Sequence, residues 1–245
     1  MAERLKVTAI VVAAGSGSRM GTQEKKQFME LAGMPLMAHS LKAFEINPAV
    51  GQIILVTGEE DLDRALQMCI KYGFSKVRNI VAGGDMRFRS VYNGLLAVEP
   101  DTDIVLIHDG ARPLLTQEVI RNCIKGAFQE KACVAAVKEK NTIKTADDHG
   151  YAAETIDRSR LFEVQTPQAF NYKLICRAYY ELRKTIEVYG TDISKITDDA
   201  VIVENMTSEK VAFVEGDYSN IKVTTPEDMA IAEALLKWQR EKEGK

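Results

Sequence analysis

The chain has 245 residues, of which 46% are hydrophobic, so it is long enough to bury a full core as one α/β domain. Its 32 basic and 35 acidic residues give a net charge of −3 without any basic block. This balance argues against a nucleic-acid-binding surface and gives no sign of membrane binding. The four cysteines have no C-x-x-C spacing, so we expect reduced thiols in a cytoplasmic protein rather than a disulfide framework or a zinc site.

The first strong signal is the apolar, β-branched run from Val7 to Ala14, which predicts a strand buried on both faces. Gly15 and Gly17 end this run and leave backbone N–H groups accessible. Three cations follow within a dozen residues: Arg19, Lys25 and Lys26. A strand end, a glycine loop and fixed cations together predict a polyphosphate site. From the glycines alone, a plain strand-to-helix turn with solvated cations is an equally good interpretation, and the cations favour anion binding.

The glycine spacing matches neither of the two common phosphate-binding fingerprints. The third glycine of G-x-G-x-x-G would fall at Met20, whereas the chain has Gly21, and no G-K-[ST] follows Gly15 at the Walker A spacing. The second predicted strand also ends in Leu55-Val-Thr57 without an acid. Both features count against an NAD-dependent dehydrogenase.

Strands and helices are predicted to alternate along most of the chain. Strands are expected at 7–14, 51–57, 77–81, 104–107, 133–137, 211–214 and 220–223, and helices at 35–44, 61–72, 87–98, 117–129, 172–187, 199–204 and 226–238. This order predicts a Rossmann-like, mostly parallel sheet with helices on both faces. Three glycine-and-charge loops follow strands, at 15–26, 83–89 and 108–112, so we expect them at the ligand-binding edge of the sheet.

The alternation breaks between residues 139 and 160, where two polar, strand-like runs flank Asp147-Asp-His-Gly150. This pattern predicts a β-hairpin with too few apolar residues to stabilise itself or to join the core. A floppy surface insertion is one interpretation. We expect instead an arm that packs on a second subunit, because Thr142, Ile143, Thr155 and Ile156 suit pairing with another strand.

Seven motifs occur in a fixed order: Ala13-Ala-Gly-Ser-Gly-Ser-Arg-Met20, Lys26-Gln-Phe28, Gly83-Gly-Asp-x-Arg-x-x-Ser90, His108-Asp-x-Ala-Arg-Pro113, Asp157-Arg158, Gln165-Thr-Pro-Gln168 and Asn220-Ile-Lys-Val-Thr-x-Pro-Glu-Asp228. Together they resemble the 2-C-methyl-D-erythritol 4-phosphate cytidylyltransferase family of the non-mevalonate isoprenoid pathway. The resemblance covers nearly the whole chain. The glycine-Arg-Met loop is shared by many sugar nucleotidyltransferases, whereas the ordered set is far more specific.

The resemblance implies one nucleotidyltransferase domain (glycosyltransferase-A-like) over 1–245, with 139–160 as a dimerisation arm. It implies transfer of CMP from CTP to 2-C-methyl-D-erythritol 4-phosphate, which gives 4-diphosphocytidyl-2-C-methyl-D-erythritol and pyrophosphate. The implied catalytic cations are Arg19, Lys26, Arg158 and Lys222, with Arg158 delivered by the arm of the neighbouring subunit.

The resemblance also assigns binding residues. The implied nucleotide-binding residues are Ala13, Ala14, Gly15, Gly83, Gly84, Asp85, Ser90 and Asp109. The implied acceptor-binding residues are Arg112, Thr142, Thr166, Arg158 and Lys222. Mg²⁺ is expected to bind mainly through the CTP triphosphate, with Asp109 as the candidate protein ligand.

Several alternatives stay open at this point. Asp109 alone could be a helix cap, and Lys222 alone would be interpreted as a solvent-facing lysine in the last strand. The nearest rival activity is a cytidylyltransferase for another polyol phosphate, such as ribitol 5-phosphate, and a non-catalytic nucleotide-binding regulator is a more distant one. His108 receives no role. Lys25 stands where the family usually has a proline, which predicts a less rigid loop.

Overall fold

The computed structural model describes residues 5–15, 24–190, 192–242 and 244. Its strands are β1 (Val7–Ala13), β2 (Glu30–Leu31), β3 (Met34–Pro35), β4 (Val50–Thr57), β5 (Val77–Ala82), β6 (Ile104–Asp109), β7 (Ala132–Lys138), β8 (Lys144–Ala146), β9 (Ala152–Thr155), β10 (Phe162–Asn171) and β11 (Ala212–Glu215). Its α-helices are α1 (Leu36–Glu45), α2 (Leu62–Tyr72), α3 (Arg87–Leu96), α4 (Gln117–Glu130), α5 (Tyr172–Tyr189), α6 (Asp199–Met206) and α7 (Pro226–Lys242). Short 3₁₀ turns cover Lys26–Phe28, Glu59–Asp61, Arg158–Arg160 and Ile193–Lys195.

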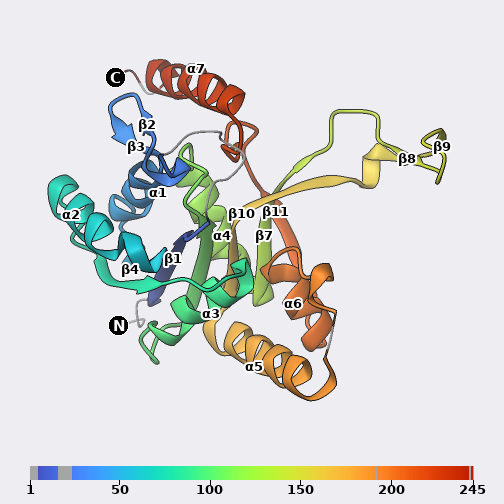
Figure 1. Cartoon of the computed structure of the whole chain (residues 1–245), viewed down its shortest axis with the longest axis horizontal. Helices are drawn as coiled ribbons and strands as arrows, with labels where there is room; N and C mark the ends of the chain where they lie inside the picture. The colour runs from blue at the N-terminus through green and yellow to red at the C-terminus, as the bar shows by residue number, and fades with distance from the viewer. Residues whose placement is uncertain (1–4, 16–23, 191, 243, 245) are drawn as a thin grey trace.

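A seven-stranded sheet in the order β11-β7-β10-β6-β1-β4-β5 forms the centre of the molecule (Figure 1). Every neighbouring pair is parallel except those of β10, which runs antiparallel to both β6 and β7. The β1–β6 register places Val12 opposite Asp109, so these two strands end at the same edge. The mostly parallel sheet is therefore confirmed.

Helices cover both faces of the sheet because successive strand residues point to opposite sides. In β1, Ala9 and Val11 pack with α1, α2 and α4, whereas Ile10 packs with α3, α5 and α6. All three side chains are fully buried. A smaller third cluster, which includes Leu31, packs α7 near the β2–β3 hairpin.

The short β2–β3 hairpin was not predicted, and two further differences concern the strands expected in the large sheet. Strand β10 was not predicted, and it is the only antiparallel strand in the described part of the large sheet. The predicted strand at 220–223 is wrong, because this stretch belongs to no strand. Its backbone makes isolated hydrogen bonds instead of a strand ladder, such as the Val223 N–H donating to the Ala111 carbonyl oxygen at 2.8 Å.

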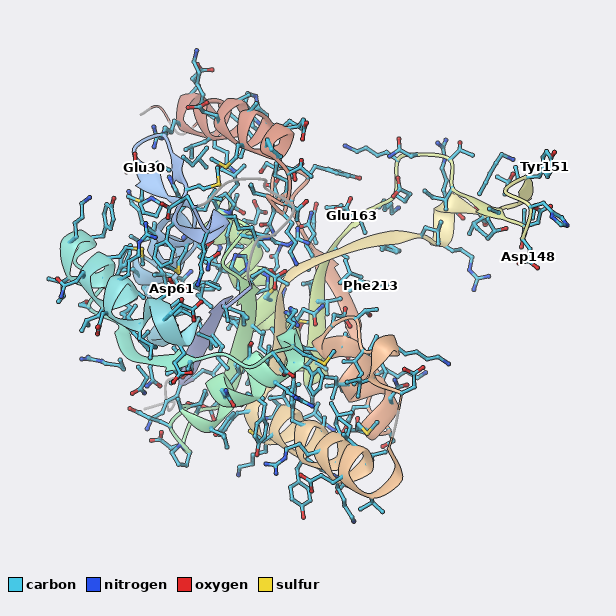
Figure 2. All side chains as sticks on the ribbon, viewed as in Figure 1. Glu30, Asp61, Asp148, Tyr151, Glu163 and Phe213 are labelled. Atoms are coloured by element: carbon cyan, nitrogen blue, oxygen red, sulfur yellow. The ribbon has the colours of Figure 1, made fainter. Side chains whose placement is uncertain are left out.

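The predicted hairpin is confirmed as an arm that projects from the body of the protein (Figure 1). Strands β8 and β9 pair antiparallel, and every residue in them is exposed. Figure 2 places Asp148 and Tyr151 at the far tip, where Tyr151 is 73% exposed. The Glu139 N–H donates to the Leu161 carbonyl oxygen at 3.1 Å and closes the base of the arm. The arm thus has no core of its own.

All four cysteines are free thiols, as the sequence predicts. Across the described ranges, none of the helices combines the length and the apolar character needed to cross a bilayer.

Candidate functional site

A cavity of about 450 Å³ opens at the sheet edge where β1 and β6 end. Nine of the predicted site residues line it: Ala13, Ala14, Gly15, Lys26, Gly84, Asp85, Ser90, Asp109 and Lys222. They come from five separate segments of the chain. The structure therefore brings most of the predicted nucleotide-binding residues together with two of the predicted cations. Arg19 lies outside the described residues.

The loop between β5 and α3 forms one wall of the cavity. The hydroxyl of Ser90 accepts from the Gly84 N–H at 3.0 Å and holds the loop against the start of α3. Gly83 lies just behind this wall, where a Cβ atom would meet the Ala14 Cβ at 2.3 Å. Only glycine allows the loop to approach the end of β1 so closely.

Lys26 and Lys222 reach the cavity from segments that lie side by side. The Lys26 ammonium donates to the Val223 carbonyl oxygen at 3.5 Å, and Lys222 forms an ion pair with Asp109 at 2.7 Å. Lys222 is held there although it is not in a strand, because the following Val223 is hydrogen-bonded to Ala111 at the end of β6. Two cations are thereby fixed beside the glycine-rich end of β1.

Asp109 is held between two cations. Its Oδ1 accepts from the Arg87 Nε at 3.1 Å, and its Oδ2 pairs with Lys222. Burial alone would raise the pKa of the Asp109 carboxyl group, but the nearby charges, Arg87 first and then Lys222, outweigh burial and lower it below its ordinary value. Asp109 is therefore ionised at neutral pH.

Arg87 is a site residue that the sequence-based reasoning missed. It lies in the glycine motif at 83–90, yet no role was assigned to it. The sequence did contain a signal for Arg87, because it is the first residue of the helix α3. A cation at that position is unfavourable for the helix dipole, so an acid is expected nearby. The acids are Asp109 and Asp199, which lie far away in the sequence.

Arg112 and Thr166, predicted to bind the acceptor, are buried behind the cavity. The Arg112 Nη1 donates to the Asn220 carbonyl oxygen at 2.7 Å, and the Asn220 amide donates to the Thr166 carbonyl oxygen at 2.8 Å. These bonds fix the segment that carries Lys222. Direct contact of either residue with an acceptor stays a prediction.

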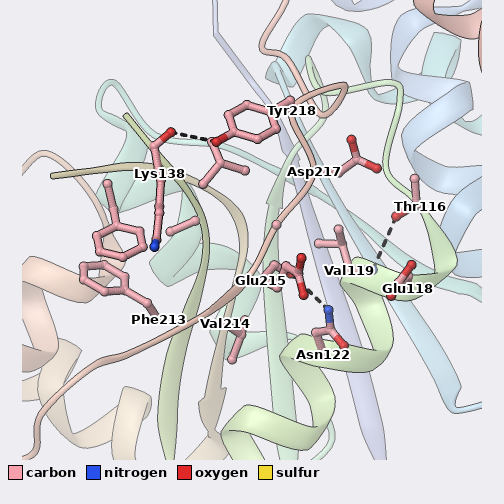
Figure 3. A pocket seen from close by; sticks show the side chains of 14 residues that line it. Thr116, Glu118, Val119, Asn122, Lys138, Phe213, Val214, Glu215, Asp217 and Tyr218 are labelled. Carbon is pink, nitrogen blue, oxygen red and sulfur yellow. Dashed lines mark hydrogen bonds between the residues drawn. The ribbon is translucent and has the colours of Figure 1, made fainter. Parts of the chain in front are cut away.

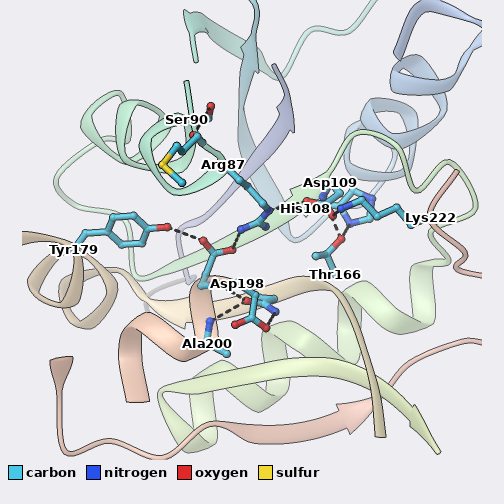
Figure 4. A network of polar contacts seen from close by, with 12 residues as sticks. Arg87, Ser90, His108, Asp109, Thr166, Tyr179, Asp198, Ala200 and Lys222 are labelled. Atoms are coloured by element: carbon cyan, nitrogen blue, oxygen red, sulfur yellow. Dashed lines mark hydrogen bonds and ion pairs between the residues drawn. The ribbon is translucent and has the colours of Figure 1, made fainter. Parts of the chain in front are cut away.

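His108 completes this buried network (Figure 4). Its Nε2 lies 3.1 Å from the Arg112 carbonyl oxygen and its Nδ1 lies 3.0 Å from the Thr166 hydroxyl. Because a carbonyl oxygen can only accept, Nε2 carries the proton and Nδ1 accepts from Thr166. The Thr166 hydroxyl in turn accepts from the Asp109 N–H at 3.1 Å. Burial lowers the pKa of His108 to about 4, so the ring is neutral.

Thr142 and Arg158 lie on the exposed arm rather than at the cavity of their own chain. The Arg158 guanidinium donates to the Lys140 carbonyl oxygen at 3.0 Å. Asp157, which precedes it, caps the following 3₁₀ turn by accepting from the Ser159 N–H. The structure therefore does not bring these two predicted residues together with Lys26 and Lys222 within one chain.

Lys25 has a defined place beside the cavity. Its ammonium pairs with Asp61 at 2.6 Å and also with Glu60. The backbone at Lys25 has φ −65°, a value that a proline also adopts. The ion pairs tie this loop to the Glu59–Asp61 turn, and the less rigid loop expected from the missing proline stays a prediction.

A second cavity, of about 660 Å³, lies at the base of the arm (Figure 3). It is lined by β11, by the first half of α4 and by the ends of β7 and β10 that meet the arm. There the Tyr218 hydroxyl donates to the Lys138 carbonyl oxygen at 2.9 Å. None of the predicted site residues lines this cavity.

The family model IspD, described as 2-C-methyl-D-erythritol 4-phosphate cytidylyltransferase, matches residues 7–238. The chain belongs to this family. It is 45% identical over 237 residues to the 2-C-methyl-D-erythritol 4-phosphate cytidylyltransferase of Alkaliphilus oremlandii, covering 96% of this chain and 97% of the relative. It is 46% identical over 234 residues to the same-named protein of Pelotomaculum thermopropionicum, covering 95% and 94%.

Solved structures agree with this membership of the cytidylyltransferase family. The crystal structure of the Anaerococcus prevotii 4-diphosphocytidyl-2C-methyl-D-erythritol synthase superposes with a TM-score of 0.82 at 35% identity. The match covers 95% of this chain and 96% of that one. The family resemblance expected from the ordered motifs is therefore confirmed.

Proposed function

We propose that this protein transfers CMP from CTP to 2-C-methyl-D-erythritol 4-phosphate, releasing pyrophosphate, in non-mevalonate isoprenoid precursor biosynthesis. Family membership over residues 7–238 supports the activity. The structural observation that best supports this activity is a single cavity at the end of β1. Lys26, Lys222 and the Gly83–Ser90 loop all converge on it. A cavity with this charge and with glycine walls suits a nucleoside triphosphate.

The reaction needs charge and alignment rather than proton transfer. An oxygen of the acceptor phosphate attacks the α-phosphorus of CTP, and the bond from that phosphorus to the bridging oxygen of the leaving pyrophosphate breaks. The attacking oxygen is already ionised at neutral pH, so no general base is required. Lys26 and Lys222 stabilise the negative charge that spreads over the phosphoryl oxygens in the transition state. Arg19 is proposed to contribute in the same way.

Cytosine is proposed to lie against the loop formed by Gly83, Gly84, Asp85 and Ser90. Its exocyclic amino group needs an acceptor, which a backbone carbonyl of this loop or the Asp85 carboxylate can provide. Uracil lacks that donor, so the same loop would discriminate against UTP. Ala13, Ala14 and Gly15 offer backbone N–H groups to the phosphates at the end of β1.

The side chains around the cavity fit a magnesium ion that is held mainly by the triphosphate. Within the described ranges, no group of three or more His, Cys, Asp or Glu side chains could form a metal cage. Asp109 faces the cavity as an ionised carboxylate, the ligand type that Mg²⁺ prefers, and would hold the ion together with phosphate oxygens. When bound, the ion supplies further positive charge to the transferring phosphoryl group.

The acceptor side is proposed to be completed by a second subunit. Thr142 and Arg158 lie on an arm that projects into solvent, which supports delivery of both residues to the cavity of a partner in a homodimer. Arg158 would bind the acceptor phosphate through its two-pronged guanidinium group. A cytoplasmic location is also proposed, and the four free thiols support it.

The direct test is pyrophosphate release by the purified protein with CTP and Mg²⁺. We expect turnover with 2-C-methyl-D-erythritol 4-phosphate and much slower turnover with ribitol 5-phosphate. Lys222→Met should lower kcat/KM about a hundredfold, because one fixed cation is lost from the transition state. Lys184→Met, which replaces an exposed lysine of α5, should keep wild-type activity. Turnover of ribitol 5-phosphate alone would move the assignment to a different cytidylyltransferase.

A further inference from the structure

A chain of alternating charges leads from the cavity into the core of the protein (Figure 4). Lys222 pairs with Asp109 at 2.7 Å, and Asp109 accepts from the Arg87 Nε at 3.1 Å. The Arg87 Nη1 then pairs with Asp199 at 2.9 Å, and Asp199 accepts from the Tyr179 hydroxyl at 2.6 Å. Lys222 is the most exposed member of this chain, with 38% of its side chain exposed, and 27% of the Arg87 side chain is exposed.

The inner end of the chain is rigidly held. Asp199 has no exposed surface, and its carboxylate is fixed by Tyr179, which is itself buried between α5 and the sheet. The backbone N–H groups of Asp199 and Ala200 both donate to the Gln168 side-chain oxygen at 3.0 Å. Asp199 therefore cannot follow Arg87 if the guanidinium moves, and it acts as a fixed anchor.

Arg87 connects this anchor to the cavity. It is the first residue of α3, and its guanidinium spans two carboxylates that come from β6 and α6. Two of its three nitrogens are committed to these acids, and the third, Nη2, is buried without a hydrogen-bond partner among the described residues. Arg87 also lines the cavity, but its Nε and Nη1 are engaged by the two carboxylates, so we expect its main influence on a ligand to pass through Asp109.

We propose that Arg87, anchored by Asp199, is a positioning residue that keeps Asp109 charge-compensated so that Lys222 can leave Asp109 and bind a phosphate. The proposal rests on the function proposed above, since the phosphate is that of CTP or of the acceptor. Lys222 cannot neutralise Asp109 and contact a phosphate at full strength at the same time. When Lys222 exchanges between the two anions, Asp109 keeps a cation from the protein only if a second one stays behind.

The electrostatics of the cavity explain why a second cation is needed. A lone carboxylate at this edge would repel a triphosphate and would hold Lys222 as its only partner. With Arg87 in place, Asp109 keeps one partner throughout the exchange. Lysine could not replace Arg87, because a single ammonium group cannot span both Asp109 and Asp199 as the planar guanidinium does.

A double-mutant cycle between Arg87 and Asp109 tests the proposal. The kcat/KM of wild type, Arg87→Met, Asp109→Asn and the double variant is measured by pyrophosphate release with CTP and the acceptor. We expect Arg87→Met to lower kcat/KM at least about tenfold in the wild-type background but less than about threefold when Asp109 is already asparagine, because no carboxylate then needs a second cation. Arg183→Met, an exposed arginine of α5 paired with Glu187, serves as the matched control and should keep wild-type values.

A purely structural role for Arg87 predicts a different result. Its loss would then lower activity by the same factor in both backgrounds, and such multiplicative losses would overturn the proposal, as would wild-type activity of Arg87→Met. If Arg87→Met does not fold, judged by circular dichroism and its unfolding midpoint, Asp199→Asn removes the charge of the anchor with little change in shape. The same lack of additivity with Asp109→Asn is then expected.

Failure of the proposed function can be separated from failure of this inference. If the wild type releases no pyrophosphate with 2-C-methyl-D-erythritol 4-phosphate, the acceptor assignment fails. The cycle is then measured through the dissociation constant of CTP by titration calorimetry. Arg87→Met should weaken CTP binding in the wild-type background and leave it nearly unchanged in the Asp109→Asn background. Equal weakening in both backgrounds would contradict the inference.

Discussion

His39 and His108 occupy different parts of the molecule but make the same kind of contact. The His108 Nε2 lies 3.1 Å from the Arg112 carbonyl oxygen, and the His39 Nε2 lies 2.8 Å from the Leu31 carbonyl oxygen. Each imidazole therefore donates from Nε2 to the backbone. Burial is the largest influence on both rings and lowers the pKa of each. Both histidines are structural donors rather than proton carriers.

His39 should make the stability of the protein depend on pH. Because its pKa is lowered in the folded state, the unfolded chain binds a proton below about pH 6.5 while the folded chain does not. The free energy of unfolding should therefore fall as the pH drops below this value, until the pH passes the folded pKa. Urea unfolding of wild type and His39→Gln at pH 7 and pH 5 measures the difference. His39→Gln should lose less stability than wild type over this interval, and equal losses would contradict the prediction.

At the residue scale, the sequence predicts charged groups better than it predicts their partners. Lys26, Asp109 and Lys222 were predicted from their motifs, and all three line the cavity. Arg87 was not recognised because its role depends on Asp199, which only the packing of α6 beside α3 brings close. A cation at the start of a helix indicates that an acid lies near it, but the sequence does not reveal which acid that is.

At the scale of elements, regular patterns were predictable and irregular ones were not. Strand β10 was missed because its middle, Gln165-Thr-Pro-Gln168, lacks an apolar alternation and contains a proline. The register of β10 against β7 is indeed interrupted between Val164 and Gln168. A polar strand at the site edge is placed by its neighbours β6 and β7 rather than by its own propensity.

The stretch 220–223 illustrates the opposite error. Ile221 and Val223 alternate with polar residues as in a half-buried strand, which is why a strand was predicted. Val223 is buried, but against Leu114 and the α7 helix rather than in the sheet. Alternation of apolar and polar residues indicates which side chains are buried. It does not indicate whether a neighbouring strand is present to pair with.

The contact between α3 and the sheet leads to a prediction about Gly94. A Cβ atom at this position would meet the Ile10 Cγ2 at 2.7 Å and the Val56 Cγ2 at 3.0 Å. Ile10 and Val56 are fully buried and β-branched, so neither can move aside easily. Gly94→Ala should therefore lower the free energy of unfolding by about 1–3 kcal/mol, although alanine is the better helix former by about 1 kcal/mol.

Chemical denaturation of Gly94→Ala and wild type measures this difference. Leu96→Ala is a useful comparison, because Leu96 lies on the same helix with 68% of its surface exposed and should change stability little. A Gly94→Ala variant that is more stable than wild type would mean that helix propensity, not the close approach of α3 to β1 and β4, decides the stability at this position.

At the scale of the whole molecule, the arm is the feature that a single chain does not explain. Its strands are exposed throughout, and Ile143 and Tyr151 present apolar surface to solvent. A two-stranded hairpin of this kind is marginally stable by itself, so a partner surface is expected to cover it. The hairpin was predicted correctly from the sequence, but the sequence does not show which surface it packs against.

If the arm completes the site of a second subunit, two inactive variants should complement each other. Arg158→Ala removes the predicted acceptor contact from the arm, and Lys222→Met removes a cation from the cavity. In a mixed dimer, the Arg158→Ala chain keeps an intact cavity and receives an intact arm from the Lys222→Met chain. Random exchange of subunits should then restore about a quarter of wild-type activity, since half of the dimers are mixed and each has one complete site.

The measurement is pyrophosphate release after the two purified variants are mixed under conditions that allow subunit exchange. Arg158→Ala alone should lower kcat or raise the KM of the acceptor while leaving CTP affinity nearly unchanged, because its side chain lies away from the CTP cavity of its own chain. A mixture of Lys222→Met with Lys26→Met, both altered in the cavity, should stay inactive and serves as the control. Complementation fails if each arm serves its own chain, since every chain in the mixture would then keep its own defect.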